Sequence, residues 1–268
     1  MRFTCAALLG LSVAVTTGCS KEDTSNDFNL QFQSRIHTGI FDDSAAEIVA
    51  YDKTNQQLFV VNGSSKVIDV YDVSNVAAPR KVGAIDTTAA AANAAGPNSV
   101  SVSNGIVAVA IENSDKQAAG FVALYNGSDL LLQTTVTVGA LPDMLTFTPD
   151  GNKIIVANEG EPNDAYDNDP EGTIAIIDLS AGAASATATV LDFNDFDSDI
   201  SDLRAANVRI FGPGASVSQD LEPEYIAINN EGDTAWVVLQ ENNAIAKLDL
   251  EDGEIDQIYP LGFKDHSA

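Results

Sequence analysis

The sequence predicts an all-β protein built from repeated four-stranded antiparallel units, and two observations point to this. First, short apolar segments recur in sets of four along the 268 residues, each set covering about 45–50 residues. Second, turn sequences rich in Gly, Asn and Asp separate the first two segments of two sets, at residues 149–152 and 230–233. Four short strands in each repeated unit are the signature of a β-propeller, in which each unit is one blade.

The strands of each unit are predicted in the same order. The first strands fall at residues 47–52, 98–102, 143–147 and 224–228, and the second, most apolar strands fall at 58–62, 106–110, 153–158 and 234–238. The third strands fall at 67–73, 121–126, 173–178 and 244–249, and the fourth at 81–86, 133–138, 188–193 and 255–261. A single twisted sheet cannot bury both of its faces, so we expect the second and third strands to be buried between neighbouring blades.

The spacing of the units predicts an insertion and an incomplete ring. Residues 193–221 interrupt the repeat before the fourth unit, and they contain a predicted short helix near 198–207 with Ser198 or Asp199 as its N-cap. An insertion of this length usually lies on a face of the domain, so it is a candidate binding element. Four blades are fewer than most propellers have, and we expect them to be part of a larger ring of about seven blades.

The N-terminus is predicted to direct export. Residues 1–18 read as a signal peptide, with Arg2 followed by an apolar run that is too short to span a bilayer. Val15-Thr16-Thr17-Gly18-Cys19 resembles a bacterial lipobox, which makes Cys19 the lipid-bearing first residue of a membrane-anchored lipoprotein. Residues 19–34 are then a polar tether and 35–268 the propeller domain. The alternative is an ordinary signal peptide with an incidental cysteine.

Charge and composition exclude several classes of partner. The formal net charge is −26, from 39 acidic and 13 basic side chains. Such a surface does not neutralise phosphates, so the chain is not expected to bind nucleic acid, and contact with a membrane is expected only through the lipid anchor. The hydrophobic fraction of 45% excludes an acidic disordered chain.

Carboxylates are the candidate site residues, because His37 and His266 are the only histidines and no nucleophile elbow or phosphate-binding loop occurs. Acids recur at the start of first strands and after second strands, which share one face of a propeller. The candidate metal ligands at the mouth of the central channel are Glu47, Asp143, Glu159, Glu161, Glu222, Glu224 and Glu241, and Glu112 stands at a related position. Clustered oxygen ligands suit Ca²⁺, and no organic cofactor is expected. The alternative is a solvated acidic rim.

A second calcium candidate lies in one acidic loop. From Asp167 the sequence reads D-x-D-x-E-G, which offers Asp169 and Glu171 as further ligands and Gly172 for a sharp turn. A strand follows where a helix would follow in an EF-hand. An ordinary acidic surface loop is the alternative.

Several phrases resemble the choice-of-anchor I family of exported bacterial propellers. They include Asn158-Glu159-Gly160-Glu161-Pro162 and Gln219-Asp220-Leu221-Glu222-Pro223-Glu224, within matching stretches at residues 38–52, 138–151, 156–162, 208–215, 219–227 and 239–244. The resemblance implies a YVTN-type propeller held at the cell surface or in the periplasm, with Cys19 as the anchor here. Relatives are often labelled alkaline phosphatase-like or similar to mesenchyme-specific cell-surface glycoprotein, and they are typically longer.

Two functions follow as hypotheses. The first is a lipid-anchored binding module whose ligand is a protein, a glycan or a phosphate ester, with calcium shaping its face. The second is a calcium-dependent phosphoesterase in which the clustered acids hold the metal. The scarcity of arginines near the acidic positions favours binding over hydrolysis of a phosphate ester.

Overall fold

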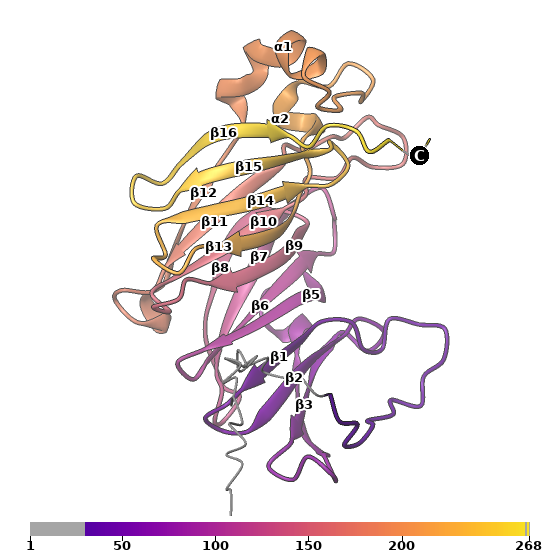
Figure 1. The fold of residues 1–268 in the computed structure, drawn as a ribbon. Helices are drawn as coiled ribbons and strands as arrows, with labels where there is room; N and C mark the ends of the chain where they lie inside the picture. The colour runs from indigo at the N-terminus through magenta and orange to yellow at the C-terminus, as the bar shows by residue number, and fades with distance from the viewer. Residues whose placement is uncertain (1–29, 266, 268) are drawn as a thin grey trace, which may run out of the picture. The chain divides into compact units, whose positions relative to one another are not determined.

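The computed structural model describes residues 30–265 and 267, and within them the chain is all-β apart from short helices. The residues from Ser34 onward form one compact unit that contains four antiparallel sheets of four strands each. Figure 1 shows the sheets following one another in chain order, from indigo to yellow. The predicted fold class is therefore confirmed. The predicted signal segment, Cys19 and His266 lie outside the described residues.

Each sheet consists of four strands that are consecutive in the chain, so every neighbouring pair is an antiparallel hairpin. The first sheet contains β1 (Val49–Asp52), β2 (Gln57–Asn62), β3 (Val67–Asp72) and β4 (Arg80–Asp86), and the second contains β5 (Ala94–Ser103), β6 (Ile106–Asn113), β7 (Ala119–Asn126) and β8 (Leu132–Ala140). The third contains β9 (Pro142–Phe147), β10 (Lys153–Asn158), β11 (Thr173–Asp178) and β12 (Thr187–Leu191), and the fourth contains β13 (Pro223–Ile228), β14 (Thr234–Leu239), β15 (Ala244–Asp249) and β16 (Glu254–Pro260). The first strands of consecutive sheets pack against one another: β1 packs against β5, β5 against β9, and β9 against β13.

The core lies between consecutive sheets, as the repeat predicts. Strand β10 shows the pattern most clearly, because side chains alternate between the two faces of a strand. Ile154 and Val156 point into the core between the second and third sheets. Ile155 and Ala157 point into the core between the third and fourth sheets. All four are fully buried, so the middle strands are apolar on both faces because each face meets another sheet.

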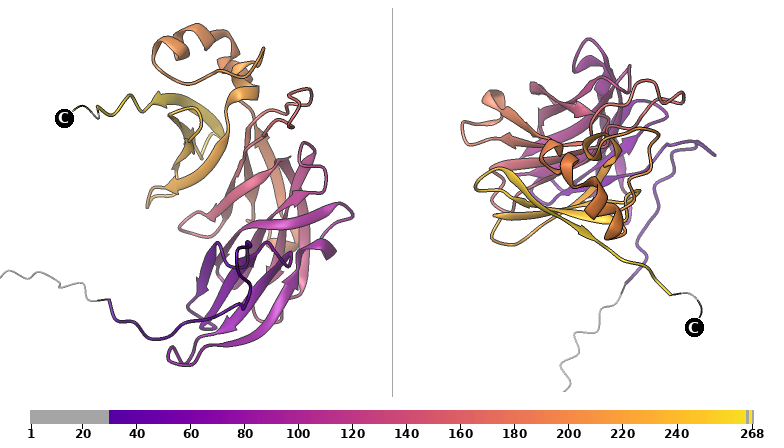
Figure 2. Two further views of the ribbon diagram at one scale, coloured as in Figure 1. Left: turned by 90° about the vertical axis from the view of Figure 1, so that its right-hand side faces the viewer. Right: turned by 90° about the horizontal axis from the view of Figure 1, so that it is seen from above.

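The insertion contains more helical segments than the single short helix that the sequence predicts. It contains the 3₁₀ helix η3 (Asn194–Asp199) and the helices α1 (Ile200–Ala205) and α2 (Val217–Asp220), while η1 (Thr87–Ala89) and η2 (Ala183–Ser185) lie elsewhere. In Figures 1 and 2 the insertion, in orange, lies beside the sheet of β13–β16. Phe193, Val217 and Leu221 are fully buried in the core between the third and fourth sheets. The insertion is therefore anchored to the core at both of its ends.

The predicted helix 198–207 is shorter in the structure, where it spans Ile200–Ala205. Asp199 occupies the N-cap position, but its side chain makes no capping bond to α1. A full capping box occurs instead at α2, where the Ser216 hydroxyl accepts from the Gln219 backbone N–H and the Gln219 side chain accepts from the Ser216 N–H. The serine and glutamine three residues apart are the sequence signal for this cap.

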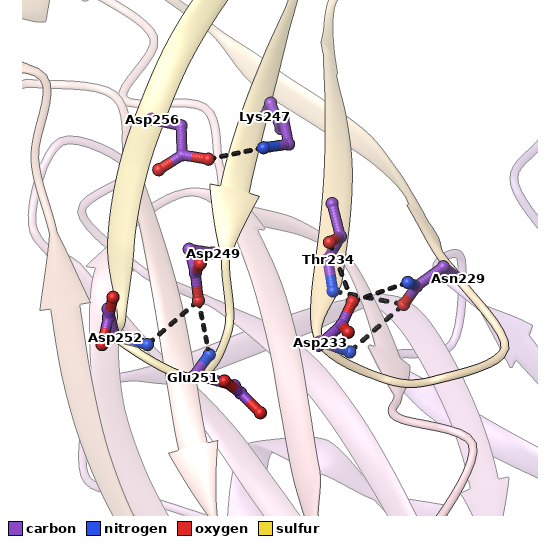
Figure 3. A network of polar contacts seen from close by, with 8 residues as sticks. All are labelled: Asn229, Asp233, Thr234, Lys247, Asp249, Glu251, Asp252 and Asp256. Atoms are coloured by element: carbon purple, nitrogen blue, oxygen red, sulfur yellow. Dashed lines mark hydrogen bonds and ion pairs between the residues drawn. The ribbon is translucent and has the colours of Figure 1, made fainter.

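Aspartate and asparagine side chains fix the hairpin turns of the fourth sheet (Figure 3). Asp249 Oδ1 accepts from the backbone N–H of Glu251 at 2.8 Å and of Asp252 at 3.0 Å, and these bonds lower the pKa of Asp249. Asn229 Oδ1 accepts from the Gly232 N–H at 3.0 Å, and Gly232 has φ +78°, which supports the predicted Asn-Glu-Gly-Asp turn.

We expect Asp249→Ala to lower the free energy of unfolding by about 1 kcal/mol, because two backbone donors lose their acceptor. Urea unfolding of the two proteins measures this difference. Asp249→Asn keeps an acceptor oxygen at the same place and is expected to recover most of the loss. An Asp249→Ala protein as stable as the parent would show that the turn does not depend on this side chain.

The outer face of the fourth sheet carries three exposed aromatic residues. Tyr225, Trp236 and Tyr259 are 57%, 38% and 41% exposed, on the face opposite the buried Val237 and Ile258. This is the face that a further blade would cover in the larger ring predicted above, and that ring stays a prediction. No helix among residues 30–265 is long and apolar enough to cross a membrane.

Candidate functional site

The candidate acids come together because antiparallel pairing brings the start of each first strand to the end of the second. In the third sheet, Pro142 pairs with Asn158, so Asp143 at the start of β9 lies near Glu159, which follows β10. The Glu159 N–H donates to the Leu141 carbonyl at 3.0 Å and holds the two chain segments together. In the fourth sheet, Pro223 pairs with Leu239, which places Glu224 and Glu241 at the corresponding end.

The charges on these side chains act on one another. Burial, followed by the negative charges of Asp143, Glu161, Glu224 and Glu222, raises the pKa of Glu159 to about 8. Burial, followed by the charges of Glu161, Glu241, Asp220 and Glu224, raises the pKa of Glu222 to about 7. The pKa values of Asp143 and Glu224 are also raised, mainly by burial. Six predicted residues are thus neighbours, and we name them the acidic cluster: Asp143, Glu159, Glu161, Glu222, Glu224 and Glu241.

Every charge that shifts the pKa of Glu159 or Glu222 is a carboxylate. A group of acids whose pKa values no cation lowers opposes its own ionisation, so Glu159 carries a proton near neutral pH. Such an arrangement lowers the stability of the fold, and perturbed groups of this kind are concentrated at functional sites. The cluster is therefore suited to bind positive charge or to donate hydrogen bonds from protonated carboxyls.

Glu47 is separate from the acidic cluster. It precedes β1 at the corresponding position of the first sheet, its N–H donates to the Val61 carbonyl, and its side chain is exposed. It is not among the charges that shift the pKa values of the cluster. Glu112 lies within β6, where its carboxylate is 3.7 Å from Lys116 Nζ. The repeat thus places Glu47 and Glu112 at related positions in the sheets, but the cluster forms only from the third and fourth sheets.

Two glycines set the spacing of the cluster. A Cβ at Gly172 would overlap the Leu221 carbonyl oxygen and would lie 3.0 Å from the Glu159 carbonyl oxygen. Gly172 is therefore required by close packing of backbone, and it does not take the left-handed conformation that a sharp turn would require. Gly160 does take the left-handed conformation, with φ +68°, and a Cβ there would overlap the Glu171 carbonyl oxygen.

Asn242 is a site residue that the sequence analysis misses. Its side chain is buried and joins three chain segments: Oδ1 accepts from the Glu222 N–H at 3.0 Å, while Nδ2 donates to the carbonyls of Arg209 and Asp220. These bonds fix the insertion and position Glu222. The available signal is a repeat of buried asparagines at or just beyond the end of the second strand of each sheet, which are Asn62, Asn113, Asn158 and Asn242.

The acids of the second calcium candidate have separate partners. Asp167 Oδ1 accepts from Asn163 Nδ2 at 2.7 Å, and Glu171 Oε2 accepts from Asn194 Nδ2 at 3.4 Å. Burial, followed by the charge of Asp220, raises the pKa of Asp169. Across residues 30–265, no three His, Cys, Asp or Glu side chains are grouped closely enough to hold a metal ion. The donor chemistry suits calcium but the spacing does not, and calcium binding stays a prediction.

Comparison with solved structures supports the propeller fold. A protein from Lactobacillus plantarum is 15% identical, with a TM-score of 0.55, over 80% of this chain and 57% of its own. A putative 6-phosphogluconolactonase from Bacteroides uniformis is 14% identical, with a TM-score of 0.51, over 80% of this chain and 56% of its own. This chain thus spans a little over half the length of these two proteins. At such identities the likeness concerns the fold alone.

No curated protein sequence matches the chain. Residues 47–268, which contain all four sheets and the acidic cluster, match the Choice-of-anchor I domain. The match covers most of the sequence, so the chain belongs to the choice-of-anchor I domain family.

Proposed function

We propose that this protein is an exported binding module, attached to the membrane through lipid on Cys19, and that it takes its ligand at the acidic cluster. The observation that carries the proposal is the convergence of six carboxylates at the same end of the third and fourth sheets, with the pKa of Glu159 raised to about 8. A fold keeps such a costly group most readily where the group has a function. Attachment through a lipid would present this face to ligands in the periplasm or outside the cell.

The chemistry of the cluster favours some of the predicted ligands over others. A phosphate ester carries negative charge and is repelled by neighbouring carboxylates, unless a cation lies between them. A protein with basic side chains or a glycan with hydroxyl groups meets complementary acceptors. We therefore favour a protein or glycan ligand over a phosphate ester.

The alternative is a calcium-dependent phosphoesterase, as the alkaline phosphatase-like label of relatives implies. The oxygen donors of the acidic cluster favour it, because a metal ion would neutralise the carboxylates and hold a phosphate. Release of p-nitrophenol from p-nitrophenyl phosphate, with and without CaCl₂, tests this alternative. Hydrolysis that the Glu159→Gln and Glu224→Gln variants abolish would establish it and would replace the binding proposal.

The binding proposal is tested with cells of the source strain that lack the protein. The mature chain with Cys19 replaced by alanine is added as a soluble, labelled protein, and saturable binding to the cells is measured. We expect the triple variant Glu159→Gln, Glu222→Gln, Glu224→Gln to lose this binding, whereas Glu231→Gln, in the exposed turn between β13 and β14, retains it. Equal binding by the triple variant would show that the acidic cluster is not the binding site.

Calcium dependence has its own prediction. The described carboxylates form no group of three that could hold a metal ion as they stand, so a bound calcium ion would have to draw them closer together. If calcium binds, we expect about 1 mM CaCl₂ to raise the melting temperature, and an unchanged melting temperature would contradict calcium binding. Thermal unfolding with CaCl₂, and again after addition of EDTA, measures this. A melting temperature that calcium raises and EDTA restores would show that the cluster closes around the ion.

A further inference from the structure

A pocket of about 450 Å³ lies beside the acidic cluster. Its walls come from the loop between β10 and β11, from the insertion, and from the loops that precede β13 and follow β14. The residues that matter for its chemistry are Glu161, Asp164, Tyr166, Phe211, Glu222 and Glu241. A smaller hollow of about 30 Å³ shares Tyr166, Phe211, Glu222 and Glu241 and adds Asp169 and Asp220.

Two aromatic rings and Pro162 form the apolar part of the pocket. Tyr166 is 59% exposed and Phe211 is 65% exposed, so both rings are free to contact a ligand. The Asp220 carboxylate fixes the backbone around Phe211, where it accepts from the N–H groups of Phe211 and Gly212 at 2.9 and 2.5 Å. The Phe211 ring is therefore presented from a hydrogen-bonded loop.

The backbone of Tyr166 is also held in place. Its φ is +52°, a conformation that is costly for a bulky residue. The Asn163 carbonyl accepts from the Tyr166 N–H at 2.9 Å. The Asn163 side chain donates from Nδ2 to Asp167 Oδ1, and its Oδ1 accepts from the Asp167 N–H. This loop keeps a strained residue whose ring lies at the pocket.

One carboxylate oxygen at the smaller hollow has no partner. Asp169 Oδ1 is buried and accepts no hydrogen bond from residues 30–265. A buried oxygen without a donor is unfavourable, and because Asp169 lines the hollow, a turn of its side chain would let this oxygen accept from a ligand N–H group there. This observation is independent of the charge of the pocket and points to a ligand that donates hydrogen bonds.

The electrostatics of the pocket select a positive ligand. Four carboxylates line the larger cavity, and no Lys or Arg is among its described lining residues. Two arginines lie close by: Arg209 donates from Nη1 to the Glu241 backbone carbonyl at 3.3 Å, and the positive charge of Arg204 acts on Asp220 at the smaller hollow. Aromatic faces attract organic cations, whereas a hard metal ion such as Ca²⁺ prefers oxygen ligands alone.

We propose that this pocket binds an organic cation, an alkylammonium or guanidinium group of the kind carried by lysine and arginine side chains. The rings of Tyr166 and Phe211 contact the cation and its alkyl chain, Glu222 and Glu241 accept its hydrogen bonds, and Asp169 is reached by a donor that enters the smaller hollow. This inference rests on the proposed function, since it names the class of ligand that the acidic face takes. The same group occurs on basic peptides and on free polyamines.

The test measures binding of two probes to the soluble mature chain in about 150 mM NaCl, where long-range charge attraction is screened. A fluorescein-labelled tetra-arginine peptide is followed by fluorescence anisotropy, and spermidine is followed as its competitor. We expect the double variant Tyr166→Ala, Phe211→Ala to bind the peptide about tenfold more weakly, although its charge is unchanged. Displacement by spermidine at similar concentrations would assign the site to free polyamines, and peptide-selective binding would assign it to a protein partner.

Two controls keep the result interpretable. Tyr51→Ala removes a ring that is 54% exposed on the first sheet and is expected to bind as the parent does. Phe211→Leu keeps the apolar bulk of the side chain but removes its aromatic face. If the double variant unfolds, peptide binding by Phe211→Leu is measured in its place. Unchanged affinity in the ring variants, or no binding of either probe by the parent, would overturn the pocket proposal. Cell binding that is lost in the triple glutamine variant but retained in the ring variants would leave the proposed function standing without the pocket.

Discussion

Replacing Gly172 with alanine is expected to lower the free energy of unfolding by about 3 kcal/mol, among the largest effects of any single substitution near the acidic cluster. The added methyl group would overlap the Leu221 carbonyl oxygen and would lie 2.8 Å from Pro223 Cδ. Both contacts belong to the chain that enters β13, so relief of the overlap must move that chain away from Gly172, just before β11. Guanidinium unfolding of both proteins measures the loss.

The same substitution is expected to disturb the acidic cluster. Gly172 packs between the Glu159 carbonyl and the Leu221 carbonyl, so a wider spacing would separate Glu159 from Glu222 and lower the pKa of Glu159. Gly253→Ala is the control, because Gly253 has φ +70° but no atom would lie within 4 Å of a Cβ there. That variant is expected to lose only about 1 kcal/mol from backbone strain. Equal losses at the two glycines would contradict the role assigned to close packing at Gly172.

The second large effect is a pH-dependent stabilisation by Glu159→Gln. The pKa of Glu159 is about 8 in the folded protein, against an ordinary value of 4.5, so the folded state binds more protons than the unfolded state between these values. Stability is therefore lost as the pH rises from about 4.5 through about 8, and the loss is complete above that range. Glutamine cannot ionise, so we expect the variant to be more stable on the order of 2 kcal/mol at about pH 9 and close to the parent at about pH 4.5.

Thermal unfolding of the parent and the Glu159→Gln variant across this range measures the effect. Glu231→Gln, which removes one charge from the exposed β13–β14 turn, is expected to give a small difference that does not grow with pH. A constant difference between the Glu159→Gln variant and the parent at all pH values would show that Glu159 ionises as an ordinary surface carboxyl. It would also remove the main support for a costly acidic face.

Much of the fold could be predicted from the sequence because its strands are short, apolar and repeated. Ile154–Ala157 of β10 illustrate this, since each residue is buried on one or other face of the strand and no polar residue interrupts the run. The insertion was harder to predict, because its helices are only a few residues long. The burial of Phe193, Val217 and Leu221 depends on contacts with the third and fourth sheets that no local pattern reveals.

Six of the acidic residues lie together because their positions repeat with the strands, and their role as metal ligands stays a prediction. Glu47 fits the same repeat but lies in the first sheet, away from the third and fourth sheets where the others meet. Position within a repeat indicates which end of a sheet a residue occupies, but it does not give the distance between two sheets. For the same reason the role of Asn242 is not predicted and the sharp turn predicted at Gly172 is wrong, because both residues join segments that are distant in sequence.

The most direct test of this account is the titration of the Glu159 carboxyl itself. Glutamate labelled with ¹³C at the side-chain carboxyl gives one NMR signal for each residue, and the signal that is lost in the Glu159→Gln variant identifies Glu159. The account predicts that this signal titrates with an apparent pKa of about 8, because Glu159 is buried beside Asp143, Glu161, Glu224 and Glu222. Titration near the ordinary value of 4.5 would contradict the convergence of these carboxylates on one face.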